Sequence, residues 1–509
     1  MALLSDRERK VLLAVSGLAY ANPFLPERTA YERAALGRDY VPAGLVWSAS
    51  VSDPATPSPN VTRLHARLSP LIEALRIRIG AAPGDARKDH AVDDLAIYED
   101  GVHYLLYQRY YADFVSSPTA GFYQKFAADW HELLGDPDRF ESVRFESAKE
   151  APHFFACFRQ TQRAFHHIFD TIIGNSMPAA RLRASAWQSV FTHHPRRYRR
   201  RLYNRMSDFP TLITGPSGTG KELVARAIAG SRYIPFDPAR GRFQDPPGES
   251  FIAVNLAALS PALIESELFG HKRGAFTGAI GDRKGWLDAC PAVGSVFLDE
   301  LGEMDLSIQV KLLRVIETRK FSAVGDTSLR EFQGKLIAAT NRDLTTEIQA
   351  GRFREDLYYR LCADLVRTPS LREQIDDSPG VLRDLLLFMV RRVVGEEAEQ
   401  SLAEVEDWVN NHMPRDYAWP GNYRELEQCV RNVIIRRSYR PMEAGEVGDG
   451  DAFMARYRRG ELAAEEVIAH YAALVYRQTG TYEQTARKLG LDRRTVKAKV
   501  DAYLAGSIH

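Results

Sequence analysis

Short apolar runs separated by glycine-rich turns and amphipathic segments dominate the middle of the chain, from about residue 205 to residue 370. Each run is apolar at consecutive positions, which predicts strands buried on both faces. Amphipathic helices between such strands are typical of a parallel sheet covered by helices, an α/β nucleotide-binding architecture. The predicted strands are residues 211–214, 251–254, 296–298 and 336–339.

The first 170 residues carry apolar positions at helical spacing, and aromatic residues dominate the apolar faces. This pattern predicts a mainly helical region whose aromatic side chains form its core, with an aromatic-lined ligand pocket as the alternative. A Pro/Ser-rich segment at residues 52–60 is expected to be a surface loop. The aromatic stripes are Tyr104, Tyr107, Tyr111 and Phe114, and Phe154, Phe158, Phe165 and Phe169.

The composition is that of an ordinary globular protein, with 45% hydrophobic and 26% charged residues among 509. This length corresponds to about three domains. Lys plus Arg number 67 and Asp plus Glu 66, so any nucleic-acid contact must use locally clustered basic residues. The four cysteines form no CxxC pair, which argues against a zinc site or a disulfide framework and favours a cytoplasmic location.

The apolar segment at residues 11–21 follows Arg9 and Lys10 and superficially resembles a signal peptide. Asp6 and Glu8 lie inside what would be its positively charged region. The segment is also shorter than the roughly 20 residues that span a bilayer. We therefore expect a buried helix here and no contact with a membrane.

A glycine-rich loop directly follows the first predicted strand and opens a helix, as in a P-loop. Its glycines let backbone N–H groups point at phosphates, and Lys221 is placed to reach the β- and γ-phosphates of ATP. Glu222 stands where the general motif has a Ser or Thr ligand for Mg²⁺. The predicted nucleotide-binding residues are Gly215, Pro216, Ser217, Gly218, Thr219, Gly220, Lys221 and Glu222.

Polar residues end the next two strands of this region. Asp299 and Glu300 follow the strand at 296–298, and two adjacent carboxylates beside a phosphate site repel each other unless a cation intervenes. We predict that Asp299 anchors Mg²⁺ and that Glu300 is the base that polarises the attacking water. Thr340 and Asn341 end a further strand and are placed to orient that water. Together these strand ends predict an ATPase.

The segment at residues 265–279, ESELFGHKRGAFTGA, contains an intact GAFTGA motif. With QVKLLRV at 309–315, AATNRDL at 338–344, GRFREDLYYRL at 351–361 and WPGNYREL at 419–426, it resembles the AAA+ domain of sigma-54-dependent transcription activators, the bacterial enhancer-binding proteins of the NtrC type. The resemblance covers residues 171–509. The residues matching the loop that touches sigma-54 in this family are Gly274, Ala275, Phe276, Thr277, Gly278 and Ala279.

The resemblance implies a hexameric ring that hydrolyses ATP with Mg²⁺ and acts on the sigma-54 RNA polymerase holoenzyme. Arg354 and Arg360 match arginine fingers, which reach the γ-phosphate held by a neighbouring subunit. Arg424 matches the sensor II arginine of the lid, and Asn255 the residue that holds the catalytic glutamate until the nucleotide state changes. Glu222 is itself a family trait, so Mg²⁺ would rely on the strand-end aspartate, the phosphates and water.

Two stretches depart from the family pattern. Residues 193–205 hold six arginines, and residues 233–248 form an extra loop before the second predicted strand. The arginine-rich stretch fits an accessory DNA or phosphate contact, or a solvated face or subunit contact of the kind that such runs more often form. Neither insertion removes a catalytic residue.

Two helices near the C-terminus have helix-turn-helix spacing. Thr481 is predicted to cap the first, with Gln484 closing a capping box and Gly490 at the turn, and Asp492 caps the second, at 493–504. The pair resembles the Fis-type domain of the family, in which the preceding helix, at 462–477, would pair two subunits on double-stranded DNA. The predicted DNA contacts are Arg493, Arg494, Thr495, Lys497 and Lys499.

The predicted chain is therefore multidomain. A mainly helical sensor or regulatory domain (1–170) precedes an α/β AAA+ P-loop domain (171–370), its helical lid (371–443), a linker (444–460) and an all-α helix-turn-helix domain (461–509). The predicted function is activation of sigma-54 RNA polymerase from an upstream DNA site, with self-association as dimer and hexamer. The alternative is a DNA-binding repressor whose ATPase serves only assembly. Residues 1–170 lack the βα alternation of a receiver domain, so a phosphorelay input is not expected.

Overall fold

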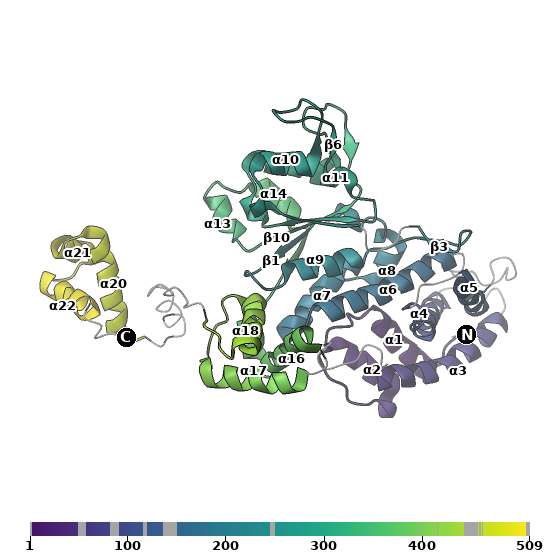
Figure 1. Ribbon diagram of the computed structural model, residues 1–509. Helices are drawn as coiled ribbons and strands as arrows, with labels where there is room; N and C mark the ends of the chain where they lie inside the picture. Colours follow the sequence, from purple (N-terminus) through teal and green to yellow (C-terminus); the bar gives the residue numbers. More distant parts are fainter. Residues whose placement is uncertain are drawn as a thin grey trace. The chain divides into compact units, whose positions relative to one another are not determined.

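The computed structural model (Figure 1) describes residues 3–48, 58–81, 91–115, 120–135, 150–244, 250–395, 398–414, 416–441, 457, 460 and 462–504. The chain forms two compact units, Met1–Arg437 and Ser438–His509. In the first unit, helices precede and follow a parallel sheet. No described helix has the length and apolar character needed to cross a membrane.

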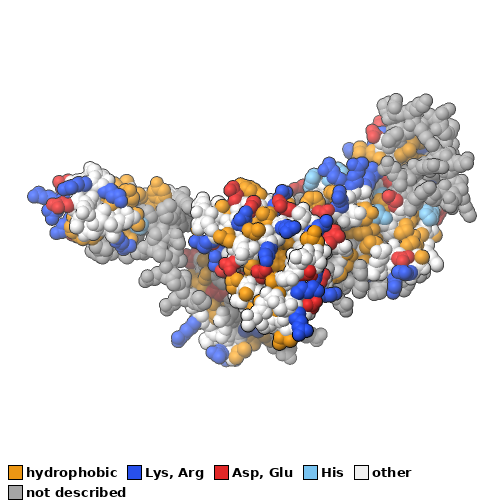
Figure 2. Space-filling view, turned by 90° about the horizontal axis from the view of Figure 1, so that it is seen from above, with side chains coloured by type: hydrophobic (Ala, Val, Ile, Leu, Met, Phe, Trp, Pro, Cys, Tyr) orange, Lys and Arg blue, Asp and Glu red, His pale blue; other side chains and the backbone are white. Residues whose placement is uncertain are grey.

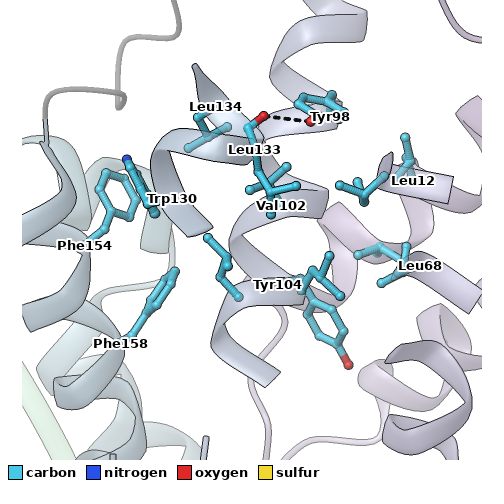
Figure 3. Close-up of a cluster of buried hydrophobic side chains, with 14 of the residues drawn as sticks. Leu12, Leu68, Tyr98, Val102, Tyr104, Trp130, Leu133, Leu134, Phe154 and Phe158 are labelled. Atoms are coloured by element: carbon cyan, nitrogen blue, oxygen red, sulfur yellow. Dashed lines mark hydrogen bonds between the residues drawn. The ribbon is translucent and has the colours of Figure 1, made fainter. Parts of the chain in front are cut away.

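The described part of residues 3–171 is helical. Ser5 and Glu8 form a capping box that starts the first helix, which buries Val11, Leu12 and Val15 as expected for residues 11–21. The helices are α1 (Asp6–Tyr20), α2 (Glu27–Leu36), α3 (Pro59–Ala81), α4 (Ala91–Arg109), α5 (Ala120–Leu134) and α6 (Ala151–Thr171). Figure 3 shows part of the core that they enclose, with Leu12, Leu68 and Val102 on one side and Trp130 and Phe154 on the other.

Helix α6 takes part in two cores. Phe155 belongs to the core of the N-terminal helices, whereas Ile168 and Phe169 pack with α7 (Met177–Phe191) and α9 (Lys221–Gly230) beneath the sheet. Figure 1 shows α9, α7 and α6 lying between the sheet and the N-terminal helices. The helical region is therefore joined to the α/β region by continuous packing along one helix.

The sheet has five parallel strands in the order β11-β1-β10-β7-β4. They are β1 (Thr211–Thr214), β4 (Phe251–Asn255), β7 (Ser295–Asp299), β10 (Lys335–Thr340) and β11 (Asp364–Arg367). Four of them are the predicted strands. The edge strand β11 was not predicted, because it is short and exposes Leu365, so it lacks the apolar run of a central strand.

Consecutive residues of each strand face opposite layers of helices. Ile213 and Ile337 pack toward α6, α7 and α9, whereas Leu212 and Leu336 pack toward the opposite layer. That layer consists of α10 (Pro261–Phe269), α12 (Leu306–Thr318) and α14 (Glu355–Leu361). Both faces of the sheet are thus covered, as the apolar runs predict.

The other elements connect and flank these layers. The first unit also holds α8 (Pro195–Arg197) with a π-helical turn Tyr198–Leu202, α11 (Trp286–Ala289), α13 (Leu344–Gln349), and the hairpins β2 (Phe236–Asp237) with β3 (Arg242–Phe243), β5 (Gly270–His271) with β6 (Arg283–Lys284), and β8 (Lys320–Phe321) with β9 (Arg330–Glu331). The lid helices are α15 (Leu371–Asp377), α16 (Val381–Val394), α17 (Ala398–His412) and α18 (Asn422–Arg436). The second unit holds α20 (Ala464–Thr479), α21 (Tyr482–Leu489) and α22 (Arg493–Leu504).

The predicted fold class is confirmed in its coarse terms: a helical N-terminal region, a central α/β domain with a parallel sheet, and C-terminal helices. Of the expected surface loop at 52–60, residues 52–57 lie outside the described part. The expectation was wrong for Asn60, which belongs to α3. Its side chain is buried, and its amide N–H donates to the Val41 carbonyl. Most of the expected linker, residues 444–456, 458 and 459, also lies outside the described part.

Candidate nucleotide site and its surroundings

The glycine-rich loop lies at the carboxyl end of β1, between β10 and β11, and leads directly into α9. Lys221 Nζ donates to the carbonyls of Gly215 and Pro216, each at 3.0 Å, so the loop curls around the amino group. Gly218 has a φ of 75°, and a Cβ there would collide with the carbonyl of Gly421. Glycine is therefore required at this position both by the backbone and by the close approach of the lid.

The lid contacts the loop through the first residues of α18. Asn422 donates its side-chain N–H to the Ser217 carbonyl at 2.9 Å, and Tyr423 donates its backbone N–H to the Gly218 carbonyl at 3.1 Å. The Arg424 guanidinium donates to Ser217 Oγ at 3.4 Å. The predicted sensor II arginine thus lies beside the P-loop. Sequence reasoning missed Asn422 and Tyr423, although both belong to the WPGNYREL segment.

The remaining loop positions are held by local bonds. Thr219 Oγ1 donates to the Pro216 carbonyl at 2.8 Å and lies 2.7 Å from the hydroxyl of Thr368. Glu222 is on the exposed first turn of α9 and pairs with Arg226 at 2.7 Å. The carboxylate of Glu222 therefore has a partner on its own helix.

The two carboxylates at the end of β7 have different constraints. Asp299 Oδ1 accepts the backbone N–H of Glu300 at 3.0 Å, and burial raises the pKa of Asp299, opposed by the charge of Lys221. Glu300 has a φ of 56°, a left-handed conformation that is uncommon for residues other than glycine and is found at functional sites. Their oxygens suit a hard cation such as Mg²⁺. The described residues hold no cluster of three or more His, Cys, Asp or Glu ligands, so phosphates and water must complete such a site.

Residues at the neighbouring strand ends are placed as follows. Asn255 pairs in register with Asp299, and its Oδ1 accepts the Ala257 N–H at 2.9 Å, which caps a 3₁₀ turn. Among the described contacts, none joins Asn255 to the predicted base. Thr340 is buried and its Oγ1 accepts the Arg342 N–H at 3.1 Å, whereas Asn341 is exposed.

Arg354 precedes α14 as its N-cap residue and Arg360 lies on α14, away from the P-loop of their own subunit. The Arg354 guanidinium donates to Asp356 at 2.7 and 3.0 Å, and Arg360 Nε donates to Glu317 at 3.1 Å. Both side chains are exposed. Neither contacts a P-loop residue among the described bonds.

The GAFTGA segment forms the tip of the β5–β6 hairpin, at the top of Figure 1. Gly274 donates its N–H to the Ala279 carbonyl at 2.9 Å, and Ala279 donates to the Phe276 carbonyl at 3.0 Å, which closes the tip. Phe276 is 43% exposed, and its ring lies 5.0 Å from that of His271. An exposed phenylalanine on a tight tip is a feature of a docking surface.

The base of the tip is anchored by charge and packing. Lys272 pairs with Asp282 at 2.7 Å, and Ala275 lies so close to Gly325 that a Cβ on the latter would meet it. Thr277 is exposed, like Phe276. The motif therefore presents an aromatic ring and a hydroxyl to the outside on a backbone held from below.

The arginine-rich insertion packs against the N-terminal helices. Asp100 of α4 is buried and accepts hydrogen bonds from Ser16 Oγ at 2.6 Å, from Tyr20 and from the Arg196 guanidinium. Arg199 lies over the ring of Tyr20 at 5.5 Å. Asp100 carried no recognisable signal in the sequence, since a single aspartate on an amphipathic helix is commonplace.

The second insertion also reaches the N-terminal helices. In its β2–β3 hairpin, Phe236 is buried, with its ring 4.7 Å from that of Tyr123 and 4.8 Å from that of Phe155. The Arg159 guanidinium lies 4.1 Å from the centre of the Phe243 ring. Residues 245–248 of this insertion lie outside the described part. Both departures from the family pattern therefore join the α/β domain to the helical region.

The three C-terminal helices pack around Ala472, Ala486, Val496 and Val500. Thr481 caps α21 by accepting the Gln484 N–H at 3.3 Å, but among the described contacts the return bond from the Gln484 side chain is missing, so the expected capping box is only half formed. The predicted contacts Arg493, Arg494, Thr495 and Lys497 are exposed, with Arg493 near Glu483 at 3.6 Å, whereas Lys499 is half-buried and pairs with Glu465 at 3.1 Å. Figure 2 shows Lys and Arg side chains on the surface of these helices.

The loop at the end of β1, the carboxylates at the end of β7 and the lid contacts define a P-loop ATPase domain of the AAA+ class. Residues 194–366 match the sigma-54 interaction domain family. The chain is 45% identical over 224 residues to the regulatory protein LuxO of Vibrio cholerae, covering 44% of this chain and 45% of LuxO. It is 39% identical over 303 residues to the transcriptional regulatory protein ZraR of Klebsiella oxytoca, covering 58% of this chain and 63% of ZraR.

A crystal structure of NtrX from Brucella abortus with ATP is 26% identical and covers 70% of this chain and 76% of its own, with a TM-score of 0.38. The matched part of the chain spans less than half the length of LuxO and less than two-thirds of the length of ZraR. Residues 194–366 are a sigma-54 interaction domain, and the resemblance to NtrC-type sigma-54-dependent activators is confirmed.

Proposed function

We propose that this chain is a sigma-54-dependent transcription activator, a hexameric ATPase that remodels sigma-54 RNA polymerase from the closed to the open promoter complex. The observation that carries the proposal is the exposed Phe276 and Thr277 tip on a domain of the sigma-54 interaction family. Such a tip needs a partner to cover its aromatic ring. The intact motif favours activation over the alternative of a repressor whose ATPase serves only assembly.

The residues around the P-loop fit hydrolysis of ATP. Backbone N–H groups of the loop and Lys221 bind the phosphates, while Arg424 approaches them from the lid. Glu300 accepts a proton from the attacking water, and Asn341 is exposed at the neighbouring strand end, in a position to orient that water. Mg²⁺, when bound with ATP at Asp299, neutralises charge on the phosphates.

The positions of Arg354 and Arg360 support assembly into a ring. Their guanidinium groups are exposed and bonded to carboxylates on their own surface, so in a ring they would exchange these partners for the γ-phosphate held by the next subunit. Charge stabilisation by an arginine finger is worth about 10³ or more in rate. Hydrolysis would therefore require assembly.

The C-terminal helices suit binding of double-stranded DNA as a dimer. Arg493, Arg494, Thr495 and Lys497 lie exposed at the start of α22, which we assign as the recognition helix of a helix-turn-helix. Ile468, Tyr471 and Leu474 recur every three residues along α20 and are each more than 40% exposed. That stripe is the surface on which two copies would pair, which would place two recognition helices on one palindromic site.

The test is ATP-dependent open-complex formation by sigma-54 RNA polymerase on promoter DNA in the presence of the full chain. Permanganate footprinting detects the melted promoter. Thr277→Ala should abolish open complexes while ATPase activity stays within about twofold, because the residue lies outside the nucleotide site. Thr345→Ala changes an exposed threonine on α13 that bonds only locally, to Asp343; it is the matched control and should behave as the natural chain.

A second variant separates hydrolysis from binding. Glu300→Gln should lower ATPase activity by about 10² to 10⁴-fold, the range of general base catalysis, while nucleotide affinity is retained. Open complexes formed equally well by Thr277→Ala and the natural chain would refute the assigned role of the tip. If the natural chain forms no open complexes although it hydrolyses ATP and binds DNA, the repressor function would be favoured.

A further inference from the structure

A cavity of about 570 Å³ lies in the first unit, among α1, α2, α4, α6 and α7. This volume is within the range that holds a small-molecule ligand. Its wall is mainly apolar and rich in aromatic residues, with contributions from helices on both sides of the boundary between the helical region and the α/β domain. The aromatic residues of the wall are Trp47, Tyr104, Tyr107, Tyr111, Phe158, Phe165, Phe169 and Trp187.

The two aromatic stripes of the N-terminal region therefore serve two purposes. Phe114 and Phe154 are core residues, as expected. Tyr107, Tyr111 and Phe165 instead line the cavity, and the Tyr111 hydroxyl bonds to His166 Nε2 at 3.0 Å. The alternative interpretation of these stripes, an aromatic-lined pocket, thus has a physical counterpart.

Buried polar groups on the wall lack partners. His103 is 5% exposed, and within the described structure neither ring nitrogen has a hydrogen-bond partner. Tyr104 is 7% exposed, and no described hydrogen bond reaches its hydroxyl, which points away from the labelled core side chains in Figure 3. A buried histidine without a partner is uncommon, and the Tyr104 hydroxyl is a donor available to an occupant of the cavity.

The charges on the wall do not balance. Arg28 and Glu32 form a buried pair at 3.2 Å, with the Arg28 guanidinium 3.5 Å from the centre of the Trp47 ring. Arg199 adds a second guanidinium, which lies 6.0 Å from the Phe158 ring and forms no ion pair with any residue in the described part of the chain. Among the residues that line this cavity, positive charges therefore exceed negative ones by one, although Arg199 also borders the adjoining cavity that holds Glu99, Asp100 and Glu150.

We propose that this cavity binds a small aromatic monoanion, such as an aromatic carboxylate. The ring would lie between the aromatic side chains of the wall, and the carboxylate would pair with Arg199 and accept a hydrogen bond from the Tyr104 hydroxyl. Arg199 belongs to the insertion that leads from α7 to β1 and the P-loop. A ligand bound to Arg199 would therefore contact the segment that joins the helical region to the ATPase domain. The proposal does not depend on the function proposed above.

The test is isothermal titration of the full chain with 2-naphthoate, alongside the neutral isostere 2-naphthamide. We expect 2-naphthoate to bind at least tenfold more tightly than the amide, because a charge-assisted bond to Arg199 is lost with the amide. Arg199→Gln should weaken 2-naphthoate at least tenfold and leave the amide within about twofold. Arg201→Gln, an exposed arginine of the same insertion, is the matched control and should change neither affinity.

A second variant guards against misfolding of Arg199→Gln. Thr161→Phe places a ring into the cavity from α6 and should abolish binding of both probes, with the tryptophan emission spectrum and melting temperature showing that the chain is folded. The proposal is overturned if 2-naphthoate does not bind the natural chain at millimolar concentration. It is also overturned if the amide binds equally well, or if Thr161→Phe binds 2-naphthoate with unchanged affinity.

Discussion

Two basic segments of this protein lie in opposite environments. In residues 193–205, Arg196 reaches the buried Asp100 and Arg199 lies over the Tyr20 ring, both half-buried against the N-terminal helices. On α22, Arg494 and Lys497 are exposed and have no described acidic partner. A run of basic residues therefore does not identify a nucleic-acid surface, whereas the partners of its side chains do. The insertion contributes to packing between regions, whereas the basic side chains of α22 are left exposed, as the proposed contact with DNA requires.

The largest expected effect separates the two segments by DNA binding. Arg493→Ala/Arg494→Ala should weaken binding of the full chain to a 30-base-pair duplex by about 100-fold, from two contacts worth about 1–3 kcal/mol each. If both arginines contact phosphates, the slope of log K against the logarithm of the salt concentration should also become less steep by about two. Fluorescence anisotropy across a salt series measures both.

The matched control for that variant takes two arginines from the insertion. Arg197→Ala/Arg201→Ala removes the same charge from exposed positions and should leave affinity and salt slope nearly unchanged. A comparable loss in both double variants would make the insertion a second DNA contact and would erase the contrast between the two segments.

The next effect concerns a basic residue that is fully buried. Lys335 of β10 donates to the Phe209 carbonyl at 2.8 Å, where the insertion joins β1, and burial lowers the pKa of Lys335 to about 8, opposed by Asp364. The unfolded chain, with a lysine pKa of about 10.4, then binds more protons between pH 8 and 10.4. The free energy of unfolding should therefore rise with pH across this window, by about 2 kcal/mol more than in Lys335→Met.

Tryptophan emission during urea unfolding measures this difference, because all six tryptophans lie within the first unit. Comparing slopes against pH between the natural chain and Lys335→Met cancels the titration of other groups. Parallel slopes for the two proteins would mean that Lys335 keeps its ordinary pKa.

A smaller loss is expected where the insertion meets α4. Asp100→Asn keeps the shape of the side chain, but its single oxygen can accept from only one of Ser16 and Tyr20, and the charge that pairs with Arg196 is removed. The expected cost is about 1–2 kcal/mol, since Arg196 is partly exposed and can turn to water. The same urea titration measures it, and Asp113→Asn, exposed beyond the end of α4, is the control. Equal stability of Asp100→Asn and the control would show that the contact is not stabilising.

Different parts of the structure could be predicted from the sequence to different extents. The four predicted strands, the P-loop and the GAFTGA tip were predictable because each depends on residues close together in the chain. The contacts of Arg196 and Phe236 were not, because Asp100 and Phe155 lie far away in sequence and no spacing rule connects them. Strand β11 was missed because its four residues, Asp364–Arg367, begin and end with a charged residue and so form no apolar run. The cavity is intermediate, since its aromatic residues were noticed while its unpartnered His103 required the folded chain.

The smallest expected effect sharpens the comparison within the insertion itself. Arg205 is 70% exposed, and its nearest acidic group, Asp208, is 3.7 Å away and half exposed. Surface pairs of this kind contribute about 0–1 kcal/mol and are screened by salt. Arg205→Ala should therefore change the free energy of unfolding by less than about 0.5 kcal/mol, and the difference should vanish in 1 M salt. Arg196→Ala, by contrast, should keep most of its larger cost at high salt, because Asp100 is buried. If Arg205→Ala proved as costly as Arg196→Ala, burial of the acidic partner would not be what sets the contribution of an arginine in this segment.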